Sequence, residues 1–218
     1  KNVKRYEPIK SDNYLILIPR GWTNTHCIDV KNKWKWFKDT YPAISTHLES
    51  FTELAEKRYD KGDYWWELRA CDYYSEFEKT KIVYPNICKK PEFTFDDKKY
   101  YTNQKCYIIP KDDKYLLGIL NSSLASFLFG MLLPKLRGDF FEPNWVVFRN
   151  IPIHSINPSN PADKARYDTM VTLVERMLAL HMQKADVKTD HEKNLVERQI
   201  EATDKQIDAL VYELYGLT

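Results

Sequence analysis

The chain has 218 residues, of which 43% are hydrophobic and 14% aromatic, and its 33 basic residues nearly balance 31 acidic ones. A chain of this length can bury a real core and form about one or two domains. Its six glycines are too widely spaced for a dinucleotide-binding fingerprint or a phosphate-cradling loop. The composition predicts a folded, soluble protein and excludes those two classes of nucleotide-binding protein.

Charge is distributed unevenly along the chain. Residues 1–157 carry a net charge of +5 and residues 158–218 a net charge of −3, and residues 1–38 alone have an excess of six positive charges. Such asymmetry is typical of a chain in which one part meets an anionic partner. Ordinary surface charge explains the +5 equally well, so the counts leave both interpretations open.

The cysteines and the apolar segments indicate a cytoplasmic protein. Four widely spaced cysteines form no CxxC pair, which is typical of reduced, buried thiols and argues against a zinc site. The longest apolar stretch, residues 115–133, is interrupted by Gly118, Asn121 and Ser122, and predicts a buried helix rather than a membrane span. Because the chain begins with Lys1 and not with Met, we expect it to be a fragment of a longer protein.

The first predicted elements lie before residue 60. The apolar run at residues 14–19 ends in a proline and predicts a short buried strand. At residues 40–59 apolar side chains recur three and four positions apart, and Pro42 stands where a first helical turn is expected. This second segment predicts an amphipathic helix.

The middle of the chain predicts a mixed body. Strands are expected at residues 81–84 and 105–109, a buried helix at residues 113–131, and extended segments at residues 145–149 and 151–153. The strands are short and are separated by long, irregular connections. That spacing favours an α+β body over repeated βαβ units.

The last part of the chain predicts an antiparallel α-hairpin joined by a short link at residues 185–188. Asn160 before Pro161 marks a helix start, Thr189 and Glu192 have the spacing of a capping box, and Gly216 can end the second helix with a positive φ. The apolar stripes alternate steps of three and four: Tyr167, Val171, Val174, Leu178 and His181, then Val196, Ile200, Thr203, Ile207, Leu210 and Leu214. We therefore predict a body at residues 1–157 and a helical hairpin at residues 158–218.

No set of catalytic residues is found. No Glu is followed by Lys two positions later and no Pro-Asp dipeptide occurs, which excludes the PD-(D/E)xK nuclease pattern. His191-Glu192 lacks the second histidine of a zinc protease, and His181 on the hairpin stripe is expected to be a hydrogen-bonded core or interface residue. The Pro-Pro pair of adenine-methylating loops is also absent. We expect a chain that is not catalytic and holds no cofactor or metal of its own.

Six tryptophans, several of them flanked by basic residues, point to recognition instead. In the segment KNKWKWFK, lysines could neutralise phosphates while the rings stack on bases. Core packing is the commoner role of a single tryptophan, and the lysines could equally protect a strand edge. The sequence leaves these alternatives open.

Three blocks follow one another between residues 64 and 153: YWWELRACDYYSEFEKTKIVYPNI, KYLLGILNSSLASFLF and PKLRGDFFEPNWVVFRNIPI. Their order resembles the TaqI-like C-terminal target-recognition (specificity) domain of adenine-specific DNA methyltransferases, type IIG restriction-modification enzymes and phage-defence methylases. The final VYELYGLT is similar to the helical tail of that family.

The resemblance implies a fold and a function. It implies an irregular, double β-helix-like α/β body followed by an α-hairpin. It also implies a domain that holds double-stranded DNA against a separate N-terminal methyltransferase domain and reads the target sequence. That other domain would flip the adenine and use S-adenosylmethionine, so this chain would need no cofactor.

The resemblance also indicates which residues contact DNA. Arg137 and Lys135, in the loop after the buried helix, are the first expected contacts, with Arg149 and Lys81 as phosphate clamps. Lys79 also matches a lysine position of the family.

Arg20, Trp22 and Asn24, in the loop after the first predicted strand, are second candidates. Arginine can bridge a guanine, and asparagine an adenine, with two hydrogen bonds.

One departure from the family pattern affects the Arg137 loop. Asp139 stands where the family commonly has a glycine, and aspartate adopts positive φ less readily. Asp139 could reshape the loop, face away from DNA, or accept a hydrogen bond from a cytosine amine. Arg137 itself could be neutralised by Asp139 or Glu142 in a salt bridge.

A second hypothesis is a protein-docking module that acts through the helical hairpin. Its stripes at residues 167–181 and 196–214 could dock on the methyltransferase domain, on a partner subunit or on a second copy. The simpler alternative is that each stripe only buries the other.

Overall fold

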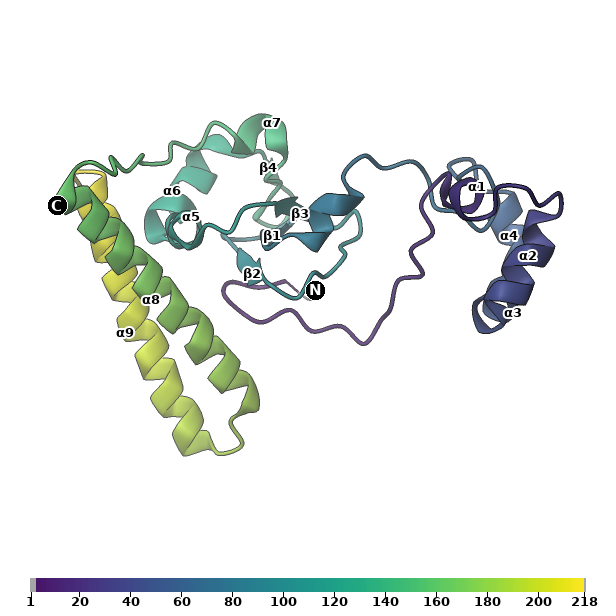
Figure 1. The fold of residues 1–218 in the computed structure, drawn as a ribbon. Coiled ribbons are helices and arrows are strands. Elements are labelled where there is room, and N and C mark those ends of the chain that lie inside the picture. The colour runs from purple at the N-terminus through teal and green to yellow at the C-terminus, as the bar shows by residue number, and fades with distance from the viewer. Residues whose placement is uncertain (1–2, 218) are drawn as a thin grey trace. The chain divides into compact units, whose positions relative to one another are not determined.

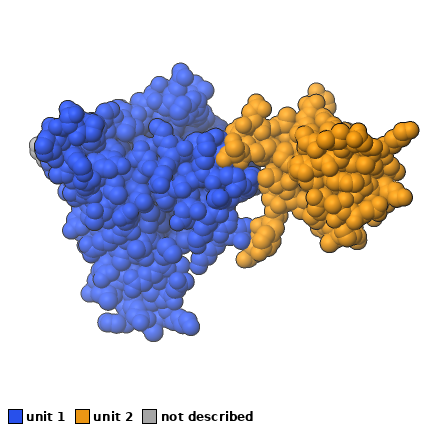
Figure 2. Space-filling view, viewed as in Figure 1, with its two compact units in different colours: residues 1–11, 76–218 blue, residues 12–75 orange. Residues whose placement is uncertain are grey.

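The computed structural model describes residues 3–217 and divides the chain into two compact units, coloured separately in Figure 2. Unit 2 consists of residues 12–75, and unit 1 of residues 1–11 and 76–218. Unit 2 is therefore inserted in the sequence of unit 1. Residues on both sides of the predicted boundary at residue 157 belong to unit 1. The division into a DNA-recognition body and a helical hairpin at that residue stays a prediction.

Unit 2 contains four short helices: α1 (Trp22–His26), α2 (Lys33–Thr40), α3 (Pro42–Glu49) and α4 (Thr52–Glu56) (Figure 1). Side chains of α1, α2 and α3 pack around the buried side chains of Ile18, Phe37 and Trp66. Five of the six tryptophans contribute to this aromatic core: Trp22, Trp34, Trp36, Trp65 and Trp66. For these five, the core-packing alternative is the right one.

The expected strand at residues 14–19 is wrong. The segment has no regular secondary structure, and the side chain of Tyr14 is 98% exposed. Ile18 is buried in the core with Ile16 packed against it, and the carbonyl oxygen of Ile18 accepts a hydrogen bond from the backbone N–H of Leu68 at 2.7 Å. A strand needs a ladder of such bonds, and this single backbone bond to Leu68 does not make one.

The helix predicted at residues 40–59 is divided into α3 and α4, with a break at residues 50–51. Pro42 stands in the first turn of α3, as expected. KNKWKWFK lies mostly in α2, where the side chain of Asn32 accepts a hydrogen bond from the backbone N–H of Lys35 at 2.9 Å. That N-cap starts a helix, so the lysines do not protect a strand edge.

The described residues of unit 1 form two small antiparallel sheets. In the first, β1 (Lys81–Pro85) lies between β2 (Thr94–Asp96) and β3 (Cys106–Ile109). The second pairs β4 (Lys135–Leu136) with β5 (Phe140–Phe141). The strands predicted at residues 81–84 and 105–109 are confirmed, as is the α+β class.

The helix predicted at residues 113–131 is two helices, α5 (Lys114–Leu120) and α6 (Ser123–Leu132), which meet at an angle of 62°. The side chain of Ser122 accepts a hydrogen bond from the N–H of Ala125 and so starts a new helix at the break. Among residues 3–217 no single helix is long and apolar enough to cross a membrane, and α5 and α6 pass that test only as a bent pair.

Residues 145–149 are not extended, since α7 (Trp145–Phe148) occupies them. The side chain of Asn144 caps α7 by accepting a hydrogen bond from the N–H of Val147 at 3.3 Å, and Phe148 is buried in the core. The two valines of α7 have a high propensity for strands. The Asn144 cap and the burial of Phe148 outweigh that propensity and favour a helix. Residues 151–153 form no strand.

The helical hairpin is confirmed as α8 (Pro161–Asp186) and α9 (Asp190–Leu214). The hydroxyl of Thr189 accepts from the N–H of Glu192 at 3.3 Å and donates to its carboxylate at 2.7 Å, and Gly216 has a φ of +65°. Ten buried side chains lie on the two helices, all apolar except that of Thr203: Met170, Val174, Met177, Leu180, Val196, Thr203, Ile207, Leu210, Val211 and Leu214. The expected stripe on α8 is therefore shifted toward its methionines.

The hairpin packs on α5 through a close contact at Gly118. A Cβ atom added to Gly118 would lie 2.5 Å from the Sδ of Met170 and 3.0 Å from a methyl group of Val174. Any larger residue would push α8 away from α5. The glycine of the LLG block is thus explained by packing.

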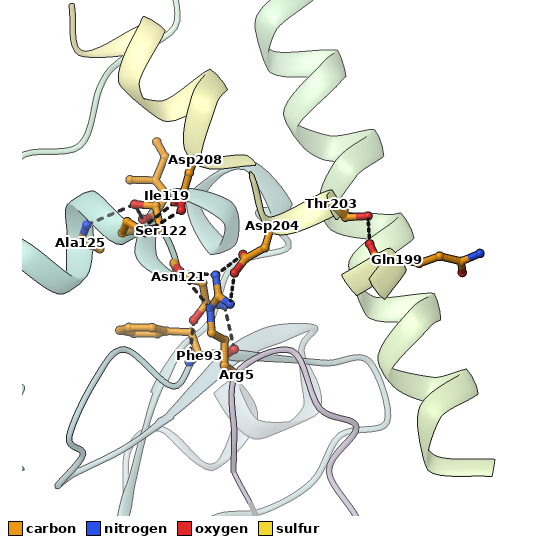
Figure 3. A network of polar contacts seen from close by, with 11 residues as sticks. Arg5, Phe93, Ile119, Asn121, Ser122, Ala125, Gln199, Thr203, Asp204 and Asp208 are labelled. Atoms are coloured by element: carbon orange, nitrogen blue, oxygen red, sulfur yellow. Dashed lines mark hydrogen bonds and ion pairs between the residues drawn. The ribbon is translucent and has the colours of Figure 1, made fainter. Parts of the chain in front are cut away.

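A polar network joins the N-terminal segment to α5, α6 and α9 (Figure 3). The guanidinium of Arg5 donates to the carbonyl oxygen of Asn121 at 2.7 and 3.0 Å and to the carboxylate of Asp204 at 2.8 Å. The amide of Asn121 bonds both the N–H and the carbonyl of Phe93, at 3.0 and 2.9 Å. The backbone and hydroxyl of Ser123 both donate to Asp208. The Asn-Ser-Ser block is thus an internal junction of unit 1.

His181 is not the hydrogen-bonded residue that the sequence predicts. Its ring centroid lies 6.1 Å from that of Tyr6, and its Nδ1 atom is buried without a hydrogen-bond partner among residues 3–217. Burial lowers the pKa of His181, while the nearby carboxylate of Glu7 opposes that shift.

Candidate nucleic-acid interface

The loop expected to contact DNA lies between β4 and β5. Lys135 pairs with Phe141 and Leu136 with Phe140, so residues 137–139 form the turn. Asp139 adopts the left-handed conformation at φ +60°, and its carboxylate lies 2.8 Å from the Nζ of Lys135. The hydrogen bond from Lys135 holds the pKa of Asp139 below its usual value. Asp139 therefore adopts the positive φ that the turn requires and forms an ion pair with Lys135 across the turn.

This pairing leaves Arg137 as the free cation of the loop. Its side chain is exposed, and its guanidinium forms no hydrogen bond or ion pair with any residue from 3 to 217. The salt bridges to Asp139 or Glu142 that the sequence allowed are not formed in this part of the chain. A hydrogen bond from a cytosine amine to Asp139 stays a hypothesis.

The predicted phosphate clamps have different environments. Arg149 is exposed just after α7 and makes no side-chain ion pair within residues 3–217. Lys79 is exposed but pairs with Glu76 at 2.6 Å. Arg149 therefore keeps a free charge for a phosphate, whereas Lys79 would have to exchange its partner.

Lys81 does not belong to this surface. Its side chain has no exposed area, and its Nζ lies 2.6 Å from the carboxylate of Asp96 and 2.7 Å from the carbonyl oxygen of Phe77. A fully buried and paired ammonium cannot reach a phosphate. The block that contains Lys81 is β1, whose side chains are buried on both faces of its strand, and this burial corrects the expected role.

Unit 2 has its own polar cluster at the start of α1. The Nε of Arg20 donates to Asp63 at 2.8 Å, and the amide nitrogen of Asn24 donates to the same carboxylate at 3.3 Å. The amide oxygen of Asn24 accepts from the hydroxyl of Tyr64 at 2.7 Å. Trp22 is half-buried and stacks on His26, with ring centroids 4.2 Å apart. Of the second candidates, Arg20 is thus the most available and Trp22 belongs to the core.

A buried carboxylate, which sequence reasoning missed, organises this cluster. Glu67 has no exposed area, and its carboxylate accepts hydrogen bonds from the backbone N–H groups of Gly21, Thr23, Asp63 and Tyr64, at 2.8 to 3.4 Å. Its setting among the aromatic residues of YWWELR was the available signal, because an acidic residue in such a block needs internal donors. Glu67 therefore fixes the loops on which Arg20 and Asp63 stand.

Metal chemistry has no evident site in the described part of the chain. Residues 3–217 contain no group of three or more His, Cys, Asp or Glu side chains arranged to hold a metal ion. The four thiols are free, and those of Cys27 and Cys88 are buried. Burial raises the pKa of Cys88 to about 12, so this thiol stays protonated at neutral pH.

A sequence model of the family described as the TaqI-like C-terminal specificity domain matches residues 1–153. The match covers more than half of the chain, and the chain belongs to this family. Family membership supports a DNA-recognition role in restriction-modification enzymes and fits a part that is not itself catalytic. The helical hairpin lies beyond the matched residues.

Proposed function

We propose that the chain reads a specific sequence in double-stranded DNA and positions the duplex for an adenine methyltransferase domain of the same enzyme. The observation that carries the proposal is Arg137, a free guanidinium on a turn whose other charged residues, Lys135 and Asp139, neutralise each other. A guanidinium can make two parallel hydrogen bonds to guanine or to a phosphate. The exposed guanidinium of Arg149 adds a contact of the kind that holds the DNA backbone.

The enzyme that would contain this domain follows from the same proposal. A cytoplasmic methyltransferase of the type IIG restriction-modification or phage-defence kind would bind S-adenosylmethionine in its own methyltransferase domain and flip the target adenine there. Residues 1–218 would supply the sequence specificity. No step of the methyl transfer would need their side chains.

The test reverses one charge in the full-length enzyme. Arg137→Glu should abolish methylation at the recognition site, because a carboxylate both loses the guanidinium contacts and repels phosphate. The matched control is Arg198→Glu on α9, an exposed arginine outside the residues that match the family. Methylation sequencing of host DNA measures both. Unchanged methylation in Arg137→Glu would contradict the assignment of Arg137.

Docking through the helical hairpin is less well supported. The inner faces of α8 and α9 bury each other and pack on α5, so most of the apolar stripe is used within unit 1. A docking partner would have to bind elsewhere on the hairpin.

A further inference from the structure

We propose that Asp63 is a positioning residue that orients Arg20 to read a guanine, so that unit 2 supplies a base contact separate from that of Arg137. This inference rests on the proposed recognition of DNA. It concerns the pair formed by the two side chains and the buried carboxylate of Glu67 beneath them.

The geometry of the pair leaves the useful end of the arginine free. Asp63 takes the Nε hydrogen of Arg20 at 2.8 Å, and the side chains are 59% and 33% exposed for Arg20 and Asp63. The two terminal amino groups of Arg20 make no hydrogen bond with any residue from 3 to 217. Those groups present the pair of parallel donors that matches O6 and N7 of guanine. With its Nε held, the guanidinium has fewer orientations to lose on binding.

The pair is fixed from below by Glu67. One carboxylate holds the N–H of Gly21 at 3.2 Å, that of Thr23 at 2.9 Å and that of Asp63 at 2.8 Å, so it joins the loop of Arg20 to the loop of Asp63. Within the loop of Asp63, a Cβ added to Gly62 would lie 2.5 Å from the Cβ of Glu67, so the chain is tightly packed around this side chain. The backbone segments that carry Arg20 and Asp63 are therefore held in position by Glu67.

Stability does not explain the pair. An exposed ion pair contributes about 0 to 1 kcal/mol to folding stability in general, which is too little to explain why two loops are held in fixed positions. A preorganised arginine, in contrast, is what discrimination between bases requires. The arrangement is better suited to recognition than to folding.

Asn24 has a supporting place in this arrangement. Its amide nitrogen donates to Asp63 and its amide oxygen accepts from Tyr64, so both ends of the amide are occupied. An asparagine that reads adenine needs both ends. Asn24 thus helps to hold Asp63, and the adenine contact expected from the sequence is not favoured.

The test is selection from a randomised duplex DNA library with the full-length enzyme at low salt, followed by sequencing. The wild type should enrich a motif that contains guanine. Arg20→Ala should lose the preference at one guanine position, by about 5- to 100-fold in relative enrichment. Asp63→Ala should weaken the preference at that same position, whereas Asp63→Asn keeps an acceptor oxygen and should restore much of it. Glu53→Ala, which breaks the exposed Lys57–Glu53 pair on α4, is the matched control and should keep the motif.

The outcomes separate this inference from the proposed function. If Arg20→Ala enriches the same motif as the wild type, the role of unit 2 is overturned and the proposed function is not. The same conclusion follows if Arg20→Ala changes the motif but Asp63→Ala does not. Loss of the same guanine preference in both variants, with melting temperatures like that of the wild type, supports it. A wild-type full-length enzyme that enriches no motif contradicts sequence-specific recognition itself, and this inference fails with it.

Discussion

Among residues 3–217, each unit contains a fully buried charged side chain whose partners are all fixed, and in unit 1 the partner carboxylate of Asp96 is buried as well. In unit 2 it is Glu67, with four backbone N–H donors, and in unit 1 it is Lys81, with Asp96 and a carbonyl oxygen. Such groups are costly to bury unless they are fully paired. They therefore indicate which loops and strands have to keep their positions.

Removal of the Glu67 carboxylate should destabilise unit 2. Glu67→Ala leaves four buried N–H groups without their acceptor, and we expect a loss of about 3 kcal/mol in the free energy of unfolding. Urea denaturation followed by tryptophan fluorescence measures it, because the tryptophans of unit 2 report on its core. Glu53→Ala on the exposed face of α4 should change stability by less than about 0.5 kcal/mol. Equal effects of the two substitutions would refute the role of Glu67.

The buried Lys81–Asp96 pair allows a similar comparison with an exposed one. Lys81→Ala leaves the carboxylate of Asp96 buried and unpaired, and should cost about 3 to 5 kcal/mol. Lys79→Ala, two residues earlier, breaks only the exposed pair with Glu76 and should cost less than about 1 kcal/mol. Thermal denaturation of both variants measures the difference. A mild effect of Lys81→Ala would mean that this lysine is accessible after all.

At this scale the sequence predicts residue types better than their exposure. The family pattern singles out the lysines at 79 and 81 and the arginine at 137 as candidates, but it does not show that Lys81 points into the core. Only the pairing of β1 with β2 brings Asp96 opposite Lys81. A contact made across a sheet register is invisible in a single sequence.

At the scale of secondary structure, local signals were reliable where a cap and a long period coincided. The starts of α8 and α9 follow Asn160 and Thr189, as capping chemistry predicts. Short segments were less predictable, because α7 is set by one capping asparagine and one buried phenylalanine against the propensity of its valines. The run at residues 14–19 has the composition of a strand but no neighbouring strand to pair with.

The N-cap of α9 should contribute measurably to the free energy of unfolding. Thr189→Ala removes the hydroxyl that bonds Glu192 twice, and we expect a loss of about 1 kcal/mol. Thr169→Ala is the matched control, because Thr169 lies inside α8, is exposed and bonds only the carbonyl of Ala165. Chemical denaturation should show little change for Thr169→Ala, since alanine is the better helix former. A larger loss for Thr169→Ala than for Thr189→Ala would contradict the importance of the cap.

At the scale of unit 1, the N-terminal segment and the hairpin share a pH-sensitive contact. Burial lowers the pKa of His181 in the folded state below the value of about 6.5 in the unfolded chain. The unfolded chain therefore binds the proton more tightly, so stability should fall as the pH drops below about 6.5. The charged groups that face His181 are Glu7 and Asp204, which raise its pKa, and Lys184 and Arg5, which lower it.

His181→Leu tests this contact. The variant removes the titrating ring and also its unpaired Nδ1 atom, so we expect it to lose less stability than the wild type between pH 7.5 and pH 5.5. Urea denaturation at the two pH values gives the comparison, and carboxylates elsewhere contribute equally to both proteins. Identical pH dependence in wild type and variant would show that His181 does not titrate differently on folding.

The insertion of unit 2 between residues 11 and 76 has a consequence for engineering. The side-chain and backbone groups that bond Glu67, Arg20 and Asp63 all lie within residues 12–75, so the recognition cluster and its support form one continuous stretch of sequence. A cassette exchanged at these two points would carry its own scaffold. Base preference could then be transplanted between related proteins without redesign of the recipient core.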